Sequence, residues 1–458
     1  ITLVSPRAFV AERQPSRATM APPPKRTRLA EKPRAGTCAL ADRIARCAID
    51  AYAAQRASCG VDVAEFPVRT VLAAFILRDD ARDSLRVLSL GVGTKTLGRY
   101  ACTTGRALVD CHAEVLARRG LKKFLLRDAR AALRGGDAND GDVVVRTREG
   151  DVKVKDGLSL HLYVSSAPCG NACVRRWAKG RSTKRRDELG TASAPSEPHE
   201  TLSRSATDAG QVALCVKVIK ASKDEDVPEV LRDMVTRGEL AAGTAPARGD
   251  GDEALTCSDK LCVWNVVGYQ GALLRRFMRE PLYVETITIG RKFSEPHLCR
   301  AMCCRVDGFR SSCGGFATTH PALMETAVVF DDVPMDVEEG AVFENPFAMI
   351  WCDGDDAAEA LNGKTGTFLH EDASAPSTSK AALYELYLSL LGEDVGDSPT
   401  FTLEAYARAK READEKYDAA KTELFEHPKM FEPRRGFDGW HEKKSKRWSG
   451  YKRTASRN

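Results

Sequence analysis

The sequence predicts an α/β fold, in which helices cover a layered sheet, for most of its 458 residues. Segments with apolar residues three or four apart alternate along the chain with short apolar runs typical of strands. Hydrophobic residues make up 43% and charged residues 29%, the usual composition of a globular protein with a sizeable core. The longest apolar runs reach about half a membrane span, which excludes a transmembrane helix.

The same periodicities place the individual elements. The predicted helices span residues 38–57, 111–127, 259–278, 379–391 and 401–425. The predicted strands span residues 87–90, 158–164, 283–289, 328–330 and 348–351. Two stretches rich in small, polar and charged residues, 180–210 and 237–254, predict flexible insertions. We therefore expect one enlarged domain at 37–445, not the several domains that the length alone suggests.

Basic residues concentrate at both ends of the chain. The net charge is +5, but residues 1–36 hold eight basic and two acidic residues, and residues 441–458 hold seven and one. The part between them is therefore acidic, with a net charge of −7. We expect disordered basic tails at 1–36 and 446–458. The cluster from Pro22 to Arg28 is either a nuclear import signal or part of a solvated tail.

Cysteine usage indicates a reducing compartment. The chain has 15 cysteines, an odd number, and its N-terminus lacks the apolar stretch of a secretion signal, so we expect an intracellular protein of the nucleus or cytoplasm. The chain begins with Ile1, and we expect translation to start at Met20. Most cysteines are then expected to be small buried residues, and a few to be metal ligands.

Three short segments place metal-binding side chains at the start of predicted helices. They are Asp110-Cys111-His112-Ala113-Glu114, Pro168-Cys169-Gly170 and Thr256-Cys257-Ser258. A helix start keeps a histidine neutral and lowers the pKa of a thiol, so both can bind a metal. One histidine and two thiolates leave the fourth position of a tetrahedral zinc ion open, and a nearby glutamate completes the pattern of a nucleobase deaminase. Taken singly, Cys169 is better explained as a buried structural residue.

The chain resembles the adenosine deaminases that act on RNA, most closely the tRNA-specific adenosine deaminase 1 family. The matching segments are Gly93-Thr94-Lys95, His112 to Arg119, Ser165 to Gly170, Thr256 to Leu261, Trp264 to Leu274 and His297 to Ala301. The resemblance implies the cytidine-deaminase-like fold, a three-layer α/β structure with helices on both faces of the sheet, extended by a C-terminal helical region. Cys173, four residues after Cys169, does not fit the close Pro-Cys-x-x-Cys pair of other zinc deaminases.

The resemblance implies that Zn²⁺ is held by His112, Cys169 and Cys257, and that Glu114 is the catalytic acid and base. Zinc lowers the pKa of a bound water towards ~7, and Glu114 moves the water proton to N1 of adenine. Attack at C6 releases ammonia and leaves inosine. Two further roles are implied: Thr94 and Lys95 line the nucleotide pocket, and Asp110 and Lys260 relay between this site and a second one.

The second implied site is a buried inositol hexakisphosphate, which the family binds beneath the zinc. The positions that match its contacts are Arg118, Arg119, Lys260, Lys380, Tyr406, Lys410, Tyr417, Lys421, Trp440, Glu442 and Lys443. A polyanion allows many basic groups to be buried with partners, whereas Arg118 and Arg119 by themselves would indicate only a solvated basic face. Val109 and Val263 stand where the family commonly has Asn and Arg.

His297, Cys299, Cys303 and Cys304 form another group of possible metal ligands. On a helix, Cys299 and Cys303 share one face, and burial in the core is the better explanation for them. The sequence therefore predicts packed thiols here rather than a second metal site.

By the same resemblance, the substrate is adenosine 37 of alanine tRNA, and the partner is the tRNA anticodon loop. A single-stranded loop suits an enzyme that needs an extruded base. Editing of double-stranded RNA is one alternative, but only 36 residues precede the expected domain, too few for the RNA-binding domains of those editases. A non-catalytic RNA-binding homologue is another, against which Glu114 and the intact ligand set argue. Because the body is acidic, the tails and a local patch near the pocket would attract RNA.

Overall fold

The computed structural model describes residues 39–60, 70–96, 105–134, 141–169, 172, 217–218, 253–331, 346–370, 375–392, 401–427 and 430. The tails expected at 1–36 and 446–458 lie outside the described residues. All of the expected insertion at 180–210 and residues 237–252 of the second do too, together with Trp440, Glu442 and Lys443.

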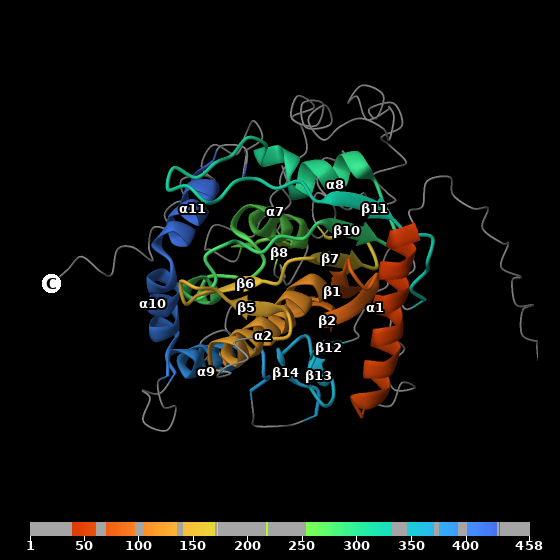
Figure 1. The fold of residues 1–458 in the computed structure, drawn as a ribbon. Coiled ribbons are helices and arrows are strands. Elements are labelled where there is room, and N and C mark those ends of the chain that lie inside the picture. The colour runs from red at the N-terminus through yellow and green to blue at the C-terminus, as the bar shows by residue number, and fades with distance from the viewer. Residues whose placement is uncertain are drawn as a thin grey trace, which may run out of the picture. The chain divides into compact units, whose positions relative to one another are not determined.

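An eight-stranded sheet forms the centre of the described chain (Figure 1). From one edge to the other its strands are β11 (Ala322–Glu325), β10 (Thr286–Ile289), β7 (Leu158–Val164), β1 (Leu72–Asp79), β2 (Ser84–Val92), β12 (Phe347–Cys352), β13 (Glu359–Asn362) and β14 (Thr367–Phe368). β10 runs parallel to both of its neighbours. The pairs from β7 to β14 are antiparallel.

Helices cover both faces of this sheet, as the side chains of β1 show. Alternate residues of the strand, such as Leu72 and Ile76, join a buried cluster with α1 (Ala39–Ser58). The residues between them, such as Phe75, join a second cluster with α2 (Ala113–Arg134). Because both faces are covered, the first six residues of β1 are all apolar and buried, with no alternation. This confirms the predicted α/β fold with helices on both faces.

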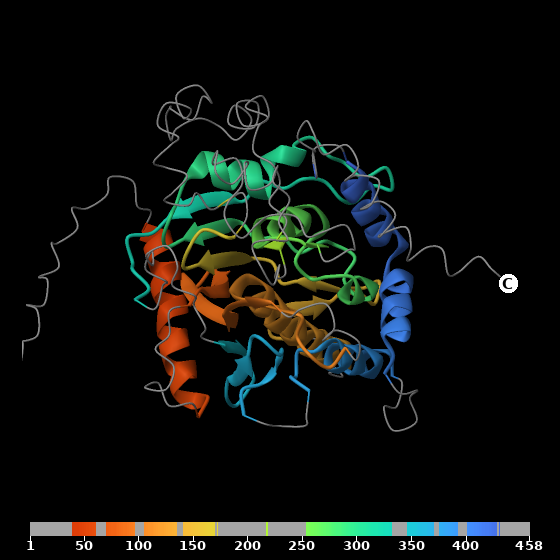
Figure 2. The same ribbon diagram turned by 180° about the vertical axis from the view of Figure 1, so that it is seen from behind.

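The remaining elements surround the sheet. The helices are α7 (Cys257–Val267), η4 (Leu273–Arg276), α8 (Glu295–Met302), η5 (Cys304–Val306), α9 (Lys380–Leu391), α10 (Leu403–Ala413) and α11 (Glu415–Glu426). Three small ribbons pair β3 (Thr94–Thr96) with β4 (Asp110–His112), β5 (Val144–Arg146) with β6 (Val152–Val154), and β8 (Lys217–Val218) with β9 (Glu253–Ala254). Helices α9 to α11 follow one another along one side in both views (Figures 1 and 2) and form the expected C-terminal helical region.

Several predicted elements are corrected by the structure. The helix predicted at 259–278 ends at Val267, because Gly268 has a φ of 86°, which stops a helix. The helix predicted at 401–425 is two helices, since Asp414 leaves helical geometry and caps α11 by accepting from Tyr417 N. Residues 328–330 form no strand, and the edge strand is β11 instead. β10 begins three residues later than expected, and Cys111 and His112 belong to β4 rather than to a helix.

Two glycines let α2 lie directly on the sheet. A Cβ atom at Gly91 of β2 would overlap backbone atoms of Ala113 and Ala117. A Cβ atom at Gly120 of α2 would lie 2.9 Å from the Cβ of Ser89 and 3.1 Å from the carbonyl oxygen of Trp351. The first two turns of α2 are therefore held against β2 with no side chain between them at these points.

Candidate active site

His112 is positioned by a short ribbon and by a neighbouring carboxylate. β3 and β4 pair so that Thr94 lies opposite His112 and Lys95 opposite Cys111. Asp110 accepts at 2.9 Å from the backbone N–H of His112 and lies 2.6 Å from its Nδ1. The second oxygen of Asp110 accepts from Lys260 Nζ. The imidazole therefore has a fixed orientation, with Nδ1 turned towards Asp110.

Cys169 and Cys257 meet although 88 residues separate them in sequence. Cys169 follows β7 by five residues, in a segment that Ser165 anchors by accepting at 2.9 Å from Leu72 N. Cys257 opens α7, and its backbone N–H donates to Cys169 Sγ at 3.3 Å. Ser258 N also donates to Cys169 O at 3.1 Å. The start of α7 thus holds Cys169 with two N–H groups, one on its sulfur and one on its carbonyl oxygen.

The first turn of α7 is itself fixed from behind. Thr256 and Asp259 form a capping box, in which each side chain accepts from the other residue's backbone N–H. Asp259 Oδ1 also accepts from Arg305 Nη1 at 2.7 Å, and this ion pair is buried. Hydrogen bonds therefore hold both the backbone and the capping residues at the start of α7, which fixes the position of Cys257.

One imidazole nitrogen and two sulfurs converge at this place. The ligand atoms of His112, Cys169 and Cys257 all lie within 4.8 Å of one another, so the three residues can hold one metal ion. Glu114, in the first turn of α2, is only 3% exposed. All four side chains were predicted from sequence, and the structure brings them together. The same is true of Asp110 and Lys260, and of Thr94 and Lys95 on the adjoining strand.

The charges at this cluster are strongly coupled. Burial raises the pKa of Glu114 above its usual range. The hydrogen bond with Cys257 lowers the pKa of Cys169 to about 7, and it correspondingly raises that of Cys257. Burial would lower the pKa of His112, but Asp110 and the other acidic groups raise it to about 9. With the protein groups alone, His112 is therefore not the neutral histidine that a helix start was expected to give. A bound cation would stabilise the ionised forms of the Glu114 carboxyl and of the Cys169 and Cys257 thiols.

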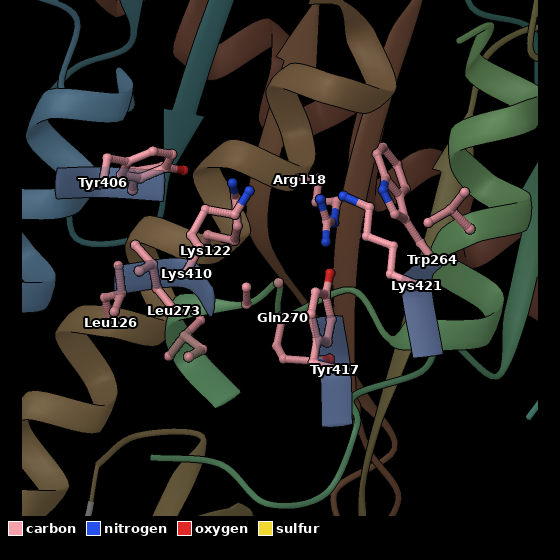
Figure 3. A pocket seen from close by; sticks show the side chains of 15 residues that line it. Arg118, Lys122, Leu126, Trp264, Gln270, Leu273, Tyr406, Lys410, Tyr417 and Lys421 are labelled. Carbon is pink, nitrogen blue, oxygen red and sulfur yellow. The ribbon is translucent and has the colours of Figure 1, made fainter. Parts of the chain in front are cut away.

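A second cluster lies further along α2, where Arg118 and Lys122 follow Glu114 by one and two turns. These two side chains line a cavity of about 120 Å³, which is far larger than the ~10–15 Å³ that one water needs (Figure 3). Tyr406 and Lys410 of α10 and Tyr417 and Lys421 of α11 close it from the other side. Arg118 stacks on Trp264, with its Cζ 4.5 Å from the ring centroid, and donates to Tyr269 O at 2.9 Å.

The cavity gathers positive charge away from water. None of the described residues that line it is acidic. Burial, followed by the charges of Arg119, Arg118, Lys410 and Lys380, lowers the pKa of Lys122 well below its usual range. Burial also lowers the pKa of Lys410, and it lowers that of Lys421 to about 7. The lowered pKa values mean that the charged form of each lysine is disfavoured in the empty cavity. An anion bound there would stabilise the charged forms and would therefore be strongly favoured.

The cavity contains most but not all of the described residues that the sequence assigned to a polyanion. Arg118, Tyr406, Lys410, Tyr417 and Lys421 line it, and so does Val263. Arg119, Lys260 and Lys380 are outside the lining: Arg119 donates to Thr378 O, and Lys260 pairs with Asp110. Trp440, Glu442 and Lys443 lie outside the described residues. Sequence reasoning missed Lys122 and Gln270 as lining residues, although the spacing of Lys122 four residues after Arg118 could have indicated the first.

Comparison with known proteins identifies the family. The model of the adenosine-deaminase (editase) domain family matches residues 89–444. The chain belongs to this family. It is similar to the double-stranded RNA-specific adenosine deaminase of Mus musculus, 31% identical over 312 residues, which are 65% of this chain and 24% of that protein. It is also similar to tRNA-specific adenosine deaminase 1 of Drosophila melanogaster, 29% identical over 219 residues, or 48% of each chain.

The human tRNA-specific adenosine deaminase 1 is 27% identical over 316 residues, which are 54% of this chain and 62% of that protein. The chain thus spans about a quarter of the first mouse relative and less than two thirds of each tRNA-specific one. The editase family predicted from the sequence is confirmed. Relatives named for double-stranded RNA and for tRNA both occur, so the comparisons do not separate these substrates. Among the described helices, none has both the length and the apolar character needed to span a membrane.

Proposed function

We propose that this protein is a zinc-dependent deaminase that converts adenosine in RNA to inosine. The observation that carries the proposal is the convergence of His112, Cys169 and Cys257 within 4.8 Å, next to the buried Glu114. Membership of the editase family supports the same reaction. The overall reaction consumes one water and releases one ammonia.

The donor set fits zinc. Imidazole and thiolate are the ligands that zinc prefers, and three of them leave one coordination position open. A zinc ion held here would supply the Lewis acidity that makes water a nucleophile near neutral pH. Because Asp110 holds Nδ1 of His112, we assign metal binding to Nε2. Asp110 then orients the ligand, and Lys260 in turn holds Asp110.

Glu114 moves the protons of the reaction. Its position in the first turn of α2, two residues after His112, would put it beside a metal held by His112, Cys169 and Cys257 without making it a ligand. Burial raises the pKa of Glu114, which suits a group that must both accept and return a proton. The carboxylate takes a proton from the attacking water and delivers it to N1 of adenine. It then takes the proton of the hydroxyl group added at C6 and passes it to the amino group on C6, which leaves as ammonia while the C6 carbonyl of inosine forms.

Within RNA, we propose tRNA as the substrate, with adenosine 37 of alanine tRNA as the target. Support comes from the resemblance of the motif residues to the tRNA-specific family and from relatives named tRNA-specific adenosine deaminase 1 in Drosophila melanogaster and Homo sapiens. Editing of double-stranded RNA is the competing function, which the 31% identity to the mouse relative favours.

One experiment separates these substrates. Purified protein is incubated with unmodified alanine tRNA, with a tRNA whose adenosine 37 is replaced by guanosine, and with a long RNA duplex. Inosine is then located by sequencing. We expect inosine at position 37 of the first substrate only. Inosine formed mainly in the duplex would overturn the tRNA assignment, and no inosine in any RNA would overturn the deaminase assignment.

We propose further that the cation-lined cavity holds inositol hexakisphosphate as a structural cofactor. Arg118, Lys122, Lys410 and Lys421 supply the positive charge, and the hydroxyls of Tyr406 and Tyr417 can donate to phosphate oxygens. To test this, the purified protein is denatured and its small molecules are analysed by mass spectrometry. We expect about one inositol hexakisphosphate per chain; its absence, or the presence of a different polyanion, would contradict the assignment.

A further inference from the structure

Arg305 in η5 is a buried cation that contacts α7 at two points. The residue is 6% exposed. Its Nη1 donates to Asp259 Oδ1 at 2.7 Å, and its Nε donates to Cys262 Sγ at 3.3 Å. An α-helix turns by about 100° per residue, so these two positions lie about 200° and about 140° round the axis from Cys257. Arg305 therefore bonds to the side of α7 that faces away from Cys257.

Asp259 carries this contact to the residue before Cys257. Its Oδ2 accepts from the backbone N–H of Thr256 at 3.1 Å and from the Thr256 hydroxyl at 2.7 Å. The Thr256 hydroxyl oxygen in turn accepts from Asp259 N at 3.2 Å. This capping box fixes the backbone of Thr256, and Cys257 is the next residue. Side-chain bonds thus connect Arg305 to the peptide that presents the Cys257 sulfur.

The segments on both sides of Arg305 are tied to α7 independently of its side chain. Asn265, near the end of α7, donates from Nδ2 to Met302 O at 3.0 Å. Thr319 also bonds to Asn265 O, with its N–H at 2.9 Å and its hydroxyl at 2.6 Å. The guanidinium of Arg305 therefore meets Asp259 from a fixed support.

A shift at the start of α7 would disturb two of the three candidate metal ligands. Cys257 N donates to Cys169 Sγ at 3.3 Å, and Ser258 N donates to Cys169 O at 3.1 Å. The first turn of α7 therefore carries one sulfur and holds the residue of the other. Without Arg305, the carboxylate of Asp259, which is 2% exposed, would lose its cationic partner. A buried carboxylate without a partner is costly, so the first turn of α7 would move to relieve the cost.

We propose that Arg305 is a positioning residue of the candidate active site. Through the capping box of α7 it sets the place of the Cys257 sulfur relative to His112. This inference rests on the proposed function, because it takes the histidine and the two cysteines as zinc ligands. Arg305 acts through α7 and not on the substrate, so we expect its loss to weaken metal binding.

The chain offers a matched control in a second buried arginine–aspartate pair. Arg275 Nε donates to Asp414 Oδ2 at 2.7 Å, and the two side chains are 9% and 13% exposed. Asp414 also caps a helix, α11, by accepting from Tyr417 N. None of the three candidate zinc ligands lies on that helix. The two pairs are therefore alike in burial and in capping, and they differ in whether the capped helix carries a metal ligand.

The test measures the zinc affinity of the full chain by competition with a chelator of known affinity, after circular dichroism has shown that each variant is folded. The zinc that His112→Ala lacks defines the metal of the candidate active site. We expect Arg305→Met to hold this zinc about 10- to 100-fold more weakly than the wild type, the usual loss when the support of a metal ligand is removed. Arg275→Met breaks the matched pair, so it should lower the thermal midpoint as Arg305→Met does but keep the wild-type zinc affinity.

A double variant separates positioning from general stability. Arg305→Met with Asp259→Asn leaves no ionised group of the pair buried alone, and the new amide oxygen can still accept from Thr256 N. We expect its thermal midpoint to return towards that of the wild type. Its zinc affinity should stay ~10-fold weaker or more, because the support of α7 is still missing. Should Arg305→Met fail to fold, the double variant alone decides.

The outcomes distinguish this proposal from the proposed function. If Arg305→Met binds zinc as tightly as the wild type, or if Arg275→Met loses as much affinity, Arg305 has no positioning role. Zinc affinity that returns in the double variant together with the thermal midpoint would also overturn that role. If no zinc in the wild type depends on His112, the catalytic metal itself is wrong, and the role of Arg305 is overturned with it.

Discussion

Two buried clusters on α2 carry opposite charge. At the start of the helix, Glu114 and the thiols of Cys169 and Cys257 gather around His112. One and two turns on, Arg118 and Lys122 face Lys410 and Lys421 across a cavity (Figure 3). Lys122 is eight positions after Glu114, a rise of about 12 Å along the helix axis. Acidic and basic groups are thus sorted along one helix instead of being paired with each other.

The difference shows what each cluster lacks. Asp110 and Lys260 pair with each other, and their pKa values move apart so that both stay charged: Lys260 and His112 lower that of Asp110, and Asp110 raises that of Lys260. The described residues that line the cavity include no acidic partner, and there the pKa values of Lys122 and Lys421 move towards the neutral form, as that of Glu114 does at the other cluster. Burial of like charges is costly without a counter-ion. The first cluster therefore calls for a cation and the second for an anion.

The largest expected effect is at Glu114. Glu114→Gln removes the proposed proton carrier while keeping the size of the side chain, so we expect inosine formation to fall by roughly 10³-fold or more. Zinc content should be unchanged, since Glu114 is not a ligand. The control is Glu412→Gln, at an exposed position of α10, which should keep full activity. Activity within about tenfold of wild type in Glu114→Gln would remove this residue from the mechanism.

A smaller effect is expected at Asp110, which orients His112. We predict that Asp110→Asn weakens zinc binding about 10- to 100-fold, as the loss of a carboxylate behind a metal-binding histidine usually does. Competition with a chelator of known affinity measures this. Asp156→Asn, an exposed carboxylate near β7, serves as the control. Unchanged zinc affinity in Asp110→Asn would show that the Asp110–His112 contact is not part of the metal site.

A substitution in the cavity is expected to change the stability in opposite directions with and without the bound anion. In protein stripped of its anion, Lys122→Met removes one buried like charge, so we expect a higher thermal midpoint than in the stripped wild type. With inositol hexakisphosphate present, the same variant loses a charge-assisted contact of about 1.5–3 kcal/mol and should be the less stable protein. Thermal unfolding of both proteins, with and without ligand, measures the crossover. Lys416→Met, at an exposed position of α11, should behave as wild type in both states. If Lys122→Met shifts the thermal midpoint in the same direction with and without ligand, the anion site is contradicted.

The smallest expected effect is proton uptake by Lys421. Its pKa of about 7, lowered from 10.5 by burial, means that in the empty cavity it is mostly neutral at pH 8. A bound polyphosphate would raise this pKa again, so binding at pH 8 should take up protons. Because the folded pKa is depressed, the empty cavity also costs stability as pH falls from the unfolded value towards 7. Calorimetry in buffers of different ionisation enthalpy measures the uptake, and Lys421→Met should reduce it by up to one proton; equal uptake by both proteins would contradict this role.

The residues that converge at the candidate site could be predicted from the sequence because their types and order are specific. His112, Cys169 and Cys257 lie in three segments that only one kind of chemistry explains together. The first strand, β1, was missed because a strand buried on both faces has no alternating pattern. The break at Asp414 was missed because the apolar periodicity runs through it.

The close seating of α2 on the sheet has a mechanical consequence. Gly91 leaves the first turns of this helix against the backbone of β2, and Gly120 lets the helix approach Ser89 of β2 and the carbonyl oxygen of Trp351 in β12. The contact between α2 and the sheet thus fixes the positions of Glu114, Arg118 and Lys122 together. A methyl group at residue 91 would push α2 away from the sheet, and this one displacement would move the side chains of both clusters out of position.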